Sequence, residues 1–189
     1  FQSSPYFADS PLHPVIEHVE RAAAITAGDS DERRLDRLER LVGTLRDRLP
    51  DLVEILADLL GIEQSRYSAL ASLAPAEKRV RTLERLADYM LQLARERPAI
   101  LIFEDLHWSD PTTREWLGQL LARAQEAPLL GLVALRADFR PSWADDPAIE
   151  HLPLERLTRD HSAAIVDGLV SDSPLSAELR ESISRFRVA

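Results

Sequence analysis

Cysteine is absent from the 189-residue sequence, lysine occurs only at Lys78, and the six glycines are far apart. Without cysteine, disulfide bonds, thiolate nucleophiles and cysteine-ligated zinc are excluded. A phosphate-binding loop of the form GxxxxGKS or GxxxxGKT needs closely spaced glycines before a lysine, because backbone amides and the lysine ammonium hold the phosphates. Lys78 stands inside a helical pattern, so these residues contain no such loop.

Long hydrophobic runs and an excess of positive charge are missing as well. No apolar stretch approaches the ~18 residues of a membrane span, and no signal peptide precedes the fold, so we expect a cytoplasmic protein without a membrane partner. The 23 Lys and Arg against 32 Asp and Glu give a net charge of −9. Nucleic-acid binding needs a basic face, and we expect no direct nucleic-acid contact from this segment.

The first 98 residues have mostly helical patterns. We expect a short strand at residues 1–4, helices over residues 14–27, 30–49, 52–60 and 75–97, and a loop over residues 62–74. Ser30 and Pro75 are typical of helix starts, whereas Pro50 and Gly61 are typical of helix ends. The chain starts at Phe1 without a methionine and stops without a helix cap. We expect a fragment truncated at both ends, although an expression boundary would explain the same ends.

Two short runs that are apolar on both faces change the pattern after residue 98. Residues 99–103 and 129–136 are typical of buried parallel strands, and Asp110 caps a helix that begins at Pro111 between them. Residues 149–154 form a weaker third strand pattern, and helices follow from about Thr158 and Ser176. The order favours an α/β fold with a parallel sheet and helices on both faces.

A pair of acids directly follows the first of these strands. Glu104 and Asp105 stand where parallel sheets bind ligands, beyond the carboxyl ends of the strands. Two adjacent carboxylates are costly to hold together without a cation or water. One acid would hold Mg²⁺ and the other would polarise an attacking water, as in phosphate-transfer ATPases. A capping or turn role for the same residues stays open.

The block FEDLHWSDP at residues 103–111 resembles the Walker B region of the STAND branch of P-loop NTPases. More narrowly, it is similar to the AAA-type ATPase modules that are fused to bacterial class III adenylate cyclases and to large LuxR-type regulators. Further segments resemble that family in the family's order, namely QSSPY at residues 2–6, LHPVI at 12–16, LRADFRP at 135–141 and HLPLERL at 151–157. The resemblance implies a partial P-loop NTPase-like domain: a mostly helical insertion over residues 1–98, a sheet core over 99–157, and a C-terminal helical part over 158–189.

The resemblance also implies ATP and Mg²⁺ as cofactors, and an attached output domain, either a nucleotide cyclase or a helix-turn-helix, as partner. Glu104 and Asp105 would hold Mg²⁺, Asp105 would polarise the water, and Arg136 would contact the γ-phosphate. The alternative for Arg136 is an ion pair with Asp138 or another carboxylate. His107 and Trp108 are more typical of residues that pack a loop under a sheet edge, and the resemblance adds a nucleotide-sensing role for His107.

Four departures from the family pattern bear on these roles. Ala134 stands where the family usually has Thr or Ser, and Ala137 stands where it usually has Pro. Glu104 stands where Asp is commoner. The missing phosphate-binding loop is the largest departure, and truncation explains it if that loop precedes Phe1. The competing function is a non-catalytic helical interaction scaffold derived from the same fold. A transition-metal site built from Glu104, Asp105, His107 and Asp110 is disfavoured, because adjacent residues on a turn point in different directions.

Overall fold

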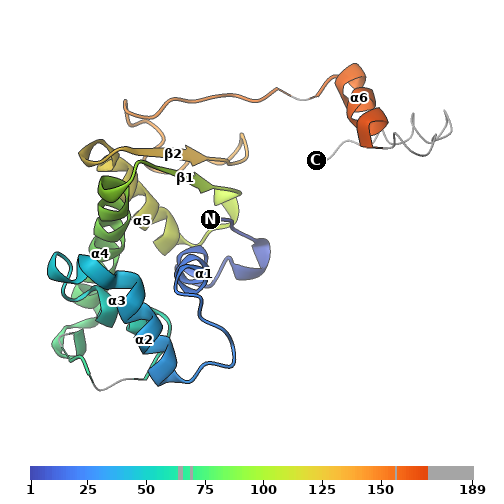
Figure 1. The fold of residues 1–189 in the computed structure, drawn as a ribbon. Coiled ribbons are helices and arrows are strands. Elements are labelled where there is room, and N and C mark those ends of the chain that lie inside the picture. Colours follow the sequence, from blue (N-terminus) through green and yellow to red (C-terminus); the bar gives the residue numbers. More distant parts are fainter. Residues whose placement is uncertain (64–65, 69, 156, 170–189) are drawn as a thin grey trace. The chain divides into compact units, whose positions relative to one another are not determined.

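The computed structural model describes residues 1–63, 66–68, 70–155 and 157–169, and it divides into two units (Figure 1). The first unit is Phe1–Ile149 and the second is Glu150–Ala189. The first contains α1 (His13–Ala22), α2 (Asp31–Val42), α3 (Leu52–Leu59), α4 (Pro75–Glu96), β1 (Ala99–Phe103), α5 (Pro111–Ala122) and β2 (Leu129–Val133). Short 3-10 turns are η1 (Pro5–Phe7), η2 (Gly43–Asp47), η3 (Leu70–Ser72), η4 (Leu106–Trp108) and η5 (Ala124–Glu126). The second contains α6 (Arg159–Leu169).

The helical patterns of the first 98 residues are confirmed, with shorter bounds for two helices. The helix expected over residues 14–27 ends at Ala22, and Ala24 has a left-handed φ of 55°. The helix expected over residues 30–49 starts where Ser30 accepts a hydrogen bond from Arg33 N. It ends as α2 at Val42, and the chain continues as the 3-10 turn η2, because the φ of +46° at Gly43 interrupts the α-helix.

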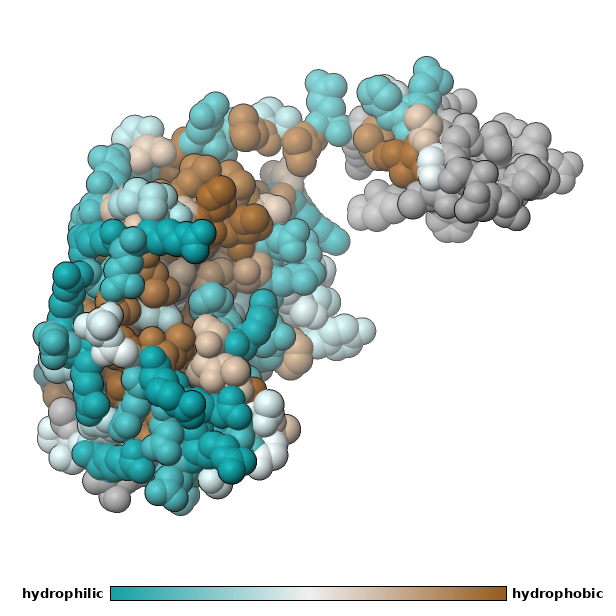
Figure 2. Space-filling view, viewed as in Figure 1, coloured by the Kyte–Doolittle hydropathy of each residue, from teal (hydrophilic) through white to brown (hydrophobic). Residues whose placement is uncertain are grey.

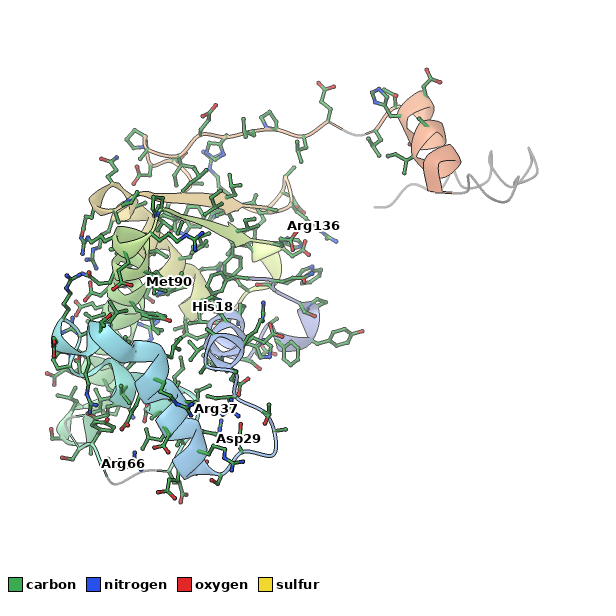
Figure 3. All side chains as sticks on the ribbon, in the orientation of Figure 1. His18, Asp29, Arg37, Arg66, Met90 and Arg136 are labelled. Carbon is green, nitrogen blue, oxygen red and sulfur yellow. The ribbon has the colours of Figure 1, made fainter. Side chains whose placement is uncertain are left out.

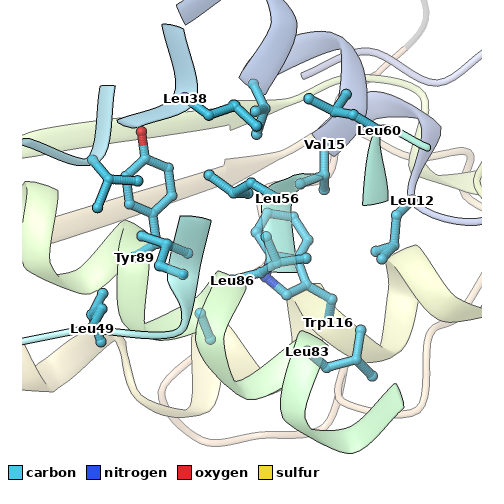
Figure 4. Close-up of a cluster of buried hydrophobic side chains, with 14 of the residues drawn as sticks. Leu12, Val15, Leu38, Leu49, Leu56, Leu60, Leu83, Leu86, Tyr89 and Trp116 are labelled. Carbon is cyan, nitrogen blue, oxygen red and sulfur yellow. The ribbon is translucent and has the colours of Figure 1, made fainter. Parts of the chain in front are cut away.

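The core lies between α3 and α4 and extends to α1, α2 and α5 (Figure 4). α3 is buried nearly all round, including Glu54, whose carboxylate accepts a hydrogen bond from Leu70 N at 2.8 Å. α4 contributes Leu83, Leu86 and Tyr89. Tyr89 is 2% exposed, and burial raises the pKa of its phenol to about 12. The helices therefore form a closed apolar interior beside the sheet.

The sheet has the predicted parallel pairing of the two apolar runs. β1 and β2 pair from Ala99 with Leu129 to Phe103 with Val133. An isolated parallel bridge joins Gln2 to Glu104, so residues 1–4 extend the sheet beyond β1 as predicted. β2 ends at Val133 rather than at residue 136, because β1 ends at Phe103 and provides no further strand partner.

Two expectations about the sheet are wrong. The third strand expected over residues 149–154 is absent from the described residues 149–155, where Pro153 has no N–H to donate to a strand partner. Helices were expected on both faces, but within the described part of residues 1–149 they pack on one face only (Figure 1). Leu101 and Phe103 are buried on that face, and Gly131 lets the Leu121 side chain of α5 approach closely.

The opposite face of the sheet is apolar and open. Its side chains, which are between 45% and 63% exposed, are Ile100, Ile102, Leu130 and Leu132. Figure 2 shows apolar surface gathered over the region of the strands.

The helix expected from about Thr158 is present as α6, which begins directly after that residue. The Thr158 hydroxyl accepts a hydrogen bond from His161 N. The helix expected from Ser176 lies outside the described residues.

Candidate functional site

The carboxyl edge of the sheet brings three chain segments together. Glu104 N donates to Phe1 O at 3.0 Å, and Ser3 N donates to Glu104 O at 3.1 Å. On the other side, Ala134 N donates to Phe103 O at 2.8 Å. Residues 1–4 and β2 therefore flank β1, and all three segments leave the sheet at the edge where parallel sheets bind ligands.

The two acids that follow β1 are both exposed at this edge. Asp105 has a left-handed backbone, with φ 55° and ψ 40°, and begins the turn η4. Such a conformation is uncommon for a residue with a side chain, and Asp tolerates it better than most. Neither carboxylate has an ion pair or a side-chain hydrogen bond with any of the described residues. Both are therefore free to bind a cation, and neither caps a helix through its side chain.

Arg136 lies at the same edge, three residues after the end of β2, and Figure 3 labels it there. Its guanidinium lies over the indole of Trp108, 5.3 Å from the ring centroid. The ion pair with Asp138 that the sequence left open is not among the contacts of the described residues. The predicted trio of Glu104, Asp105 and Arg136 thus shares one sheet edge, as the strand pairing required.

His107 is packed rather than presented to solvent. Its imidazole lies 5.0 Å from the Trp108 indole, centroid to centroid, at an interplanar angle of 46°. Both ring nitrogens are buried, and neither has a hydrogen-bond partner. The arrangement agrees with the packing alternative for His107 and Trp108, and a nucleotide-sensing role for His107 stays a prediction.

Asp110 has the capping role that the sequence predicts and a second role that it does not. One carboxylate oxygen accepts hydrogen bonds from Thr112 N and Thr113 N at 2.8 and 2.9 Å, which begins α5. The other accepts from Leu12 N at 3.2 Å, far away in sequence. Asp110 is 2% exposed and fully used by these contacts, so it is unavailable as a metal ligand.

Aromatic packing holds the residue 1–4 segment against the sheet. The Phe1 ring stacks on Phe103 at 5.8 Å and lies 5.7 Å from Trp116. Phe1 also lies 4.7 Å from the imidazole of His18 (Figure 3). Burial, with nearby positive charge as a smaller cause, lowers the pKa of His18 below its ordinary value.

Sequence reasoning missed a shallow hollow beside this edge. It is lined by residues of the first segment and of the η4–α5 turn, among them Ser3, Ser4, Phe7, His13, Trp108 and Asp110. Ser3 Oγ is buried there without a hydrogen-bond partner. The signal available in the sequence was two small hydroxyl residues within the short strand predicted at residues 1–4, which is a weak pattern.

The residues present fit one part of an Mg–ATP site and not the other. Mg²⁺ is usually bound by one or two carboxylates together with substrate phosphates and waters, which suits the unpaired Glu104 and Asp105. The described residues contain no group of three or more His, Asp or Glu that would form an all-protein metal cage. A cradle for the phosphates is missing from the sequence, and Lys78 is paired with Asp58 on α3 instead.

Comparison with known proteins gives one family and one similar protein. A model of the family described as AAA ATPase domain matches residues 3–133. An uncharacterised protein of Rhizobium meliloti (strain 1021) is 29% identical over 167 residues, which cover 86% of this chain and 16% of that protein. No solved structure matches. Among the described residues, no helix is long and apolar enough to cross a membrane.

Proposed function

The chain belongs to the AAA ATPase domain family, and from this premise we propose that it is part of an ATP-binding and hydrolysing regulatory module of a multidomain bacterial signalling protein. One observation carries the proposal. Glu104, Asp105 and Arg136 share the carboxyl edge of the parallel sheet, and both carboxylates lack a partner among the described residues. Two free acids and one arginine at such an edge suit phosphoryl transfer from a metal-bound triphosphate.

The two acids have different roles in this proposal. When bound, Mg–ATP supplies the reacting phosphoryl group and the cation that neutralises its charge. Glu104 and Asp105 together hold the cation through carboxylate oxygens. Asp105 also accepts a hydrogen bond from the attacking water and orients it. The left-handed backbone of Asp105 turns the chain directly after Glu104.

Arg136 contributes positive charge toward the γ-phosphate. Arginine suits this role because its guanidinium is always charged and presents several donors in a fixed plane. Charge that is fixed in position before the reaction stabilises the charge that develops on the phosphoryl oxygens. His107 stands two residues after Asp105, and in this proposal it reports nucleotide occupancy through the packing of η4 rather than through a direct contact in the state described.

The signalling context rests on resemblance and on length. The chain spans 16% of the length of the similar protein from Rhizobium meliloti, so a module of this size has room for attached domains. The STAND-type pattern of FEDLHWSDP supports a nucleotide cyclase or a helix-turn-helix as the output domain. ATP binding and slow hydrolysis would switch that output domain, in the cytoplasm where ATP is available.

A second candidate is a non-catalytic helical interaction scaffold. Two observations favour it: the sequence has no phosphate-binding loop, and one face of the sheet is apolar and open. The two candidates differ in what precedes Phe1 in the full-length protein. A GxxxxGKS or GxxxxGKT motif within about 60 residues upstream, the length of a strand, loop and helix with connections, favours the ATPase. A start methionine close before Phe1 favours the scaffold.

The test is ATP hydrolysis by the full-length protein and by Asp105→Asn. This change keeps the size of the side chain and removes its charge, so hydrolysis should fall about a hundredfold or more, while ATP still binds. Asp138→Asn makes the same chemical change on an exposed acid that follows β2, and it should leave hydrolysis unchanged. Equal rates for Asp105→Asn and Asp138→Asn would remove Asp105 from the catalytic machinery.

A further inference from the structure

At the carboxyl edge of the sheet, the guanidinium of Arg136 contacts the indole of Trp108. The guanidinium carbon lies 5.3 Å from the indole centroid, within the range of a cation–π interaction. Tryptophan is the strongest aromatic partner for a cation. The Arg136 side chain is otherwise exposed, and it has no carboxylate partner in the part of the chain that the structure describes.

This absence is notable because two carboxylates lie at the same edge. Glu104 and Asp105 are exposed and unpaired, and an arginine released beside them would be attracted to them. A bidentate pair between a guanidinium and a carboxylate is also a favourable geometry. Such a pair would occupy the oxygens that the cation needs. An indole that binds the guanidinium would therefore compete with the acids for it.

The turn that carries the indole is held by backbone hydrogen bonds and by a ring contact. Trp108 N donates to Asp105 O at 2.9 Å, and the His107 ring packs against the indole. Leu106, which is fully buried in the same turn, donates from its N–H to Ala134 O at 3.0 Å. Ala134 is two residues before Arg136. The turn that carries the indole is thus hydrogen-bonded to the segment that carries the arginine.

We propose that Trp108 is a positioning residue whose indole holds the Arg136 guanidinium at the sheet edge and away from the carboxylates of Glu104 and Asp105. The acids then stay open to the cation, and the arginine stays within reach of the site. The inference rests on the proposed function for the identity of the cation and deepens it by naming a residue that regulates access to that site. It concerns the residues of this chain and has a readout that needs no nucleotide.

The first test is ¹⁹F NMR of the full-length protein labelled with fluorotryptophan, without nucleotide. The Trp108 resonance is the one that Trp108→Phe removes. Arg136→Gln should shift that resonance, because the charge over the ring is lost, whereas Arg40→Gln, on the exposed side of α2, should leave it in place. A Trp108 resonance that is unmoved by Arg136→Gln overturns the proposal.

The second test measures how much Mg²⁺ gives half-maximal ATP hydrolysis. Trp108→Leu should raise this concentration about two- to fivefold, the population change that an exposed cation–π contact supplies, with little change in kcat at saturating Mg²⁺. Trp108→Tyr, which keeps an aromatic face, should restore most of the wild-type value. In the Arg136→Gln background, Trp108→Leu should have no further effect, because no guanidinium remains to compete.

The outcomes separate this inference from the proposed function. An unchanged Mg²⁺ requirement in Trp108→Leu, with normal hydrolysis, overturns the positioning role and leaves the ATPase assignment intact. An equal effect of Trp108→Leu with and without Arg136 shows a general packing role and also overturns it. If the wild-type protein hydrolyses no ATP, the proposed function fails, and the ¹⁹F comparison alone decides whether Trp108 holds Arg136.

Discussion

The buried carboxylate of Asp110 accepts a hydrogen bond from the backbone N–H of Leu12, 98 residues away in sequence. Leu12 has a left-handed φ of 58° and directly precedes α1. The same carboxylate caps α5 through Thr112 N and Thr113 N. One side chain therefore fixes the starts of two helices, and it stands between the segment after residues 1–4 and the turn after β1.

Asp110→Ala should destabilise the protein by about 2–4 kcal/mol. The change removes a helix cap, worth about 1 kcal/mol, and leaves the Leu12 N–H buried without a partner, which costs about 1–3 kcal/mol. Urea unfolding followed by circular dichroism gives the value. Ser30→Ala is the matched control, because Ser30 caps α2 alone and its loss should cost only about 1 kcal/mol. Equal losses for the two variants would contradict the role of the Leu12 contact.

The two roles of Asp110, as helix cap and as partner of Leu12, also show what the sequence can and cannot predict. The cap was predictable, because Asp before Pro at the start of an apolar helical pattern is a local signal. The Leu12 contact was not, because it depends on where the tertiary fold places a segment nearly a hundred residues away. The parallel pairing of β1 and β2 was predictable from two buried runs and a capped helix between them. That pairing was enough to bring Glu104 and Arg136 to one edge.

The errors in the sequence-based predictions have physical causes as well. A run that is apolar on both faces predicts burial on both faces, yet Ile100 and Leu130 are exposed in the described unit. Periodicity reports what a strand can bury and not what covers it. The weak pattern over residues 149–154 was interpreted as a strand despite Pro153, whose missing N–H is the stronger signal. Nothing local predicted that the Trp108 indole, rather than a carboxylate, would contact Arg136.

Acid should weaken the junction between α3 and α4 through Asp51. Arg81 Nε and Arg85 Nε donate to its two oxygens at 2.6 and 2.7 Å. Burial opposes ionisation of Asp51, but these hydrogen bonds outweigh it and hold the pKa of the carboxyl below its ordinary value. A lowered pKa in the folded state stabilises the fold above the unfolded pKa of about 3.9, and this contribution is lost as the pH falls through the folded pKa.

Asp51→Asn should therefore lower the free energy of unfolding by about 1–2 kcal/mol at pH 7, because hydrogen bonds to a charged group are lost. The difference from wild type should begin to shrink below about pH 4, where the unfolded carboxyl binds a proton, and should vanish only as the folded carboxyl also loses its charge at lower pH. Denaturant titrations of both proteins from about pH 3 to pH 7, a range that spans the carboxyl pKa, measure this difference in the free energy of unfolding. Asp58→Asn, which removes an exposed pair with Lys78, should have a smaller effect. A difference that stays constant with pH would exclude ionisation of Asp51 as its source.

The isolated chain of residues 1–189 should associate with itself through the sheet. β2 pairs only with β1 among the described residues, and unpaired strand edges and exposed apolar patches promote association. Replacing Ile102 and Leu132 with Thr places β-branched side chains, which suit strands, at both positions and removes apolar surface. The double variant should associate less in sedimentation velocity, whereas Leu154→Thr, outside the sheet, should behave like wild type. A wild-type chain that stays monomeric at all concentrations contradicts the prediction.

The same isolated chain should bind Mg–ATP no more tightly than about 1 mM, or roughly −4 kcal/mol. Two acids and one arginine cannot hold a triphosphate without the backbone amides and lysine of a phosphate-binding loop, which this sequence lacks. Isothermal titration calorimetry measures the affinity, with the full-length protein as the positive control. Micromolar binding by the isolated chain would place the phosphate site elsewhere in these residues.

Glu104→Gln and Arg136→Ala should impair the full-length protein in different ways. Glu104→Gln weakens a cation ligand, so the Mg²⁺ concentration for half-maximal hydrolysis should rise about tenfold, the loss expected for one charge-assisted contact. Arg136→Ala removes charge aimed at the terminal phosphate, so kcat should fall about a hundredfold at saturating Mg²⁺. It should also weaken ATP binding more than ADP binding, because only ATP has the γ-phosphate. Hydrolysis rates over a Mg²⁺ series, with nucleotide titrations, separate the two effects.

The pattern across these variants decides more than any single rate. Arg140→Ala is the matched control for Arg136→Ala, because it lies four residues further along and pairs with Asp145 on the surface. Normal hydrolysis in Glu104→Gln, Asp105→Asn and Arg136→Ala would make all three residues structural, and the site would lie elsewhere. If Asp105→Asn stops hydrolysis while the output domain still responds to ATP, then binding alone selects the active state. Turnover would in that case end the signal rather than start it.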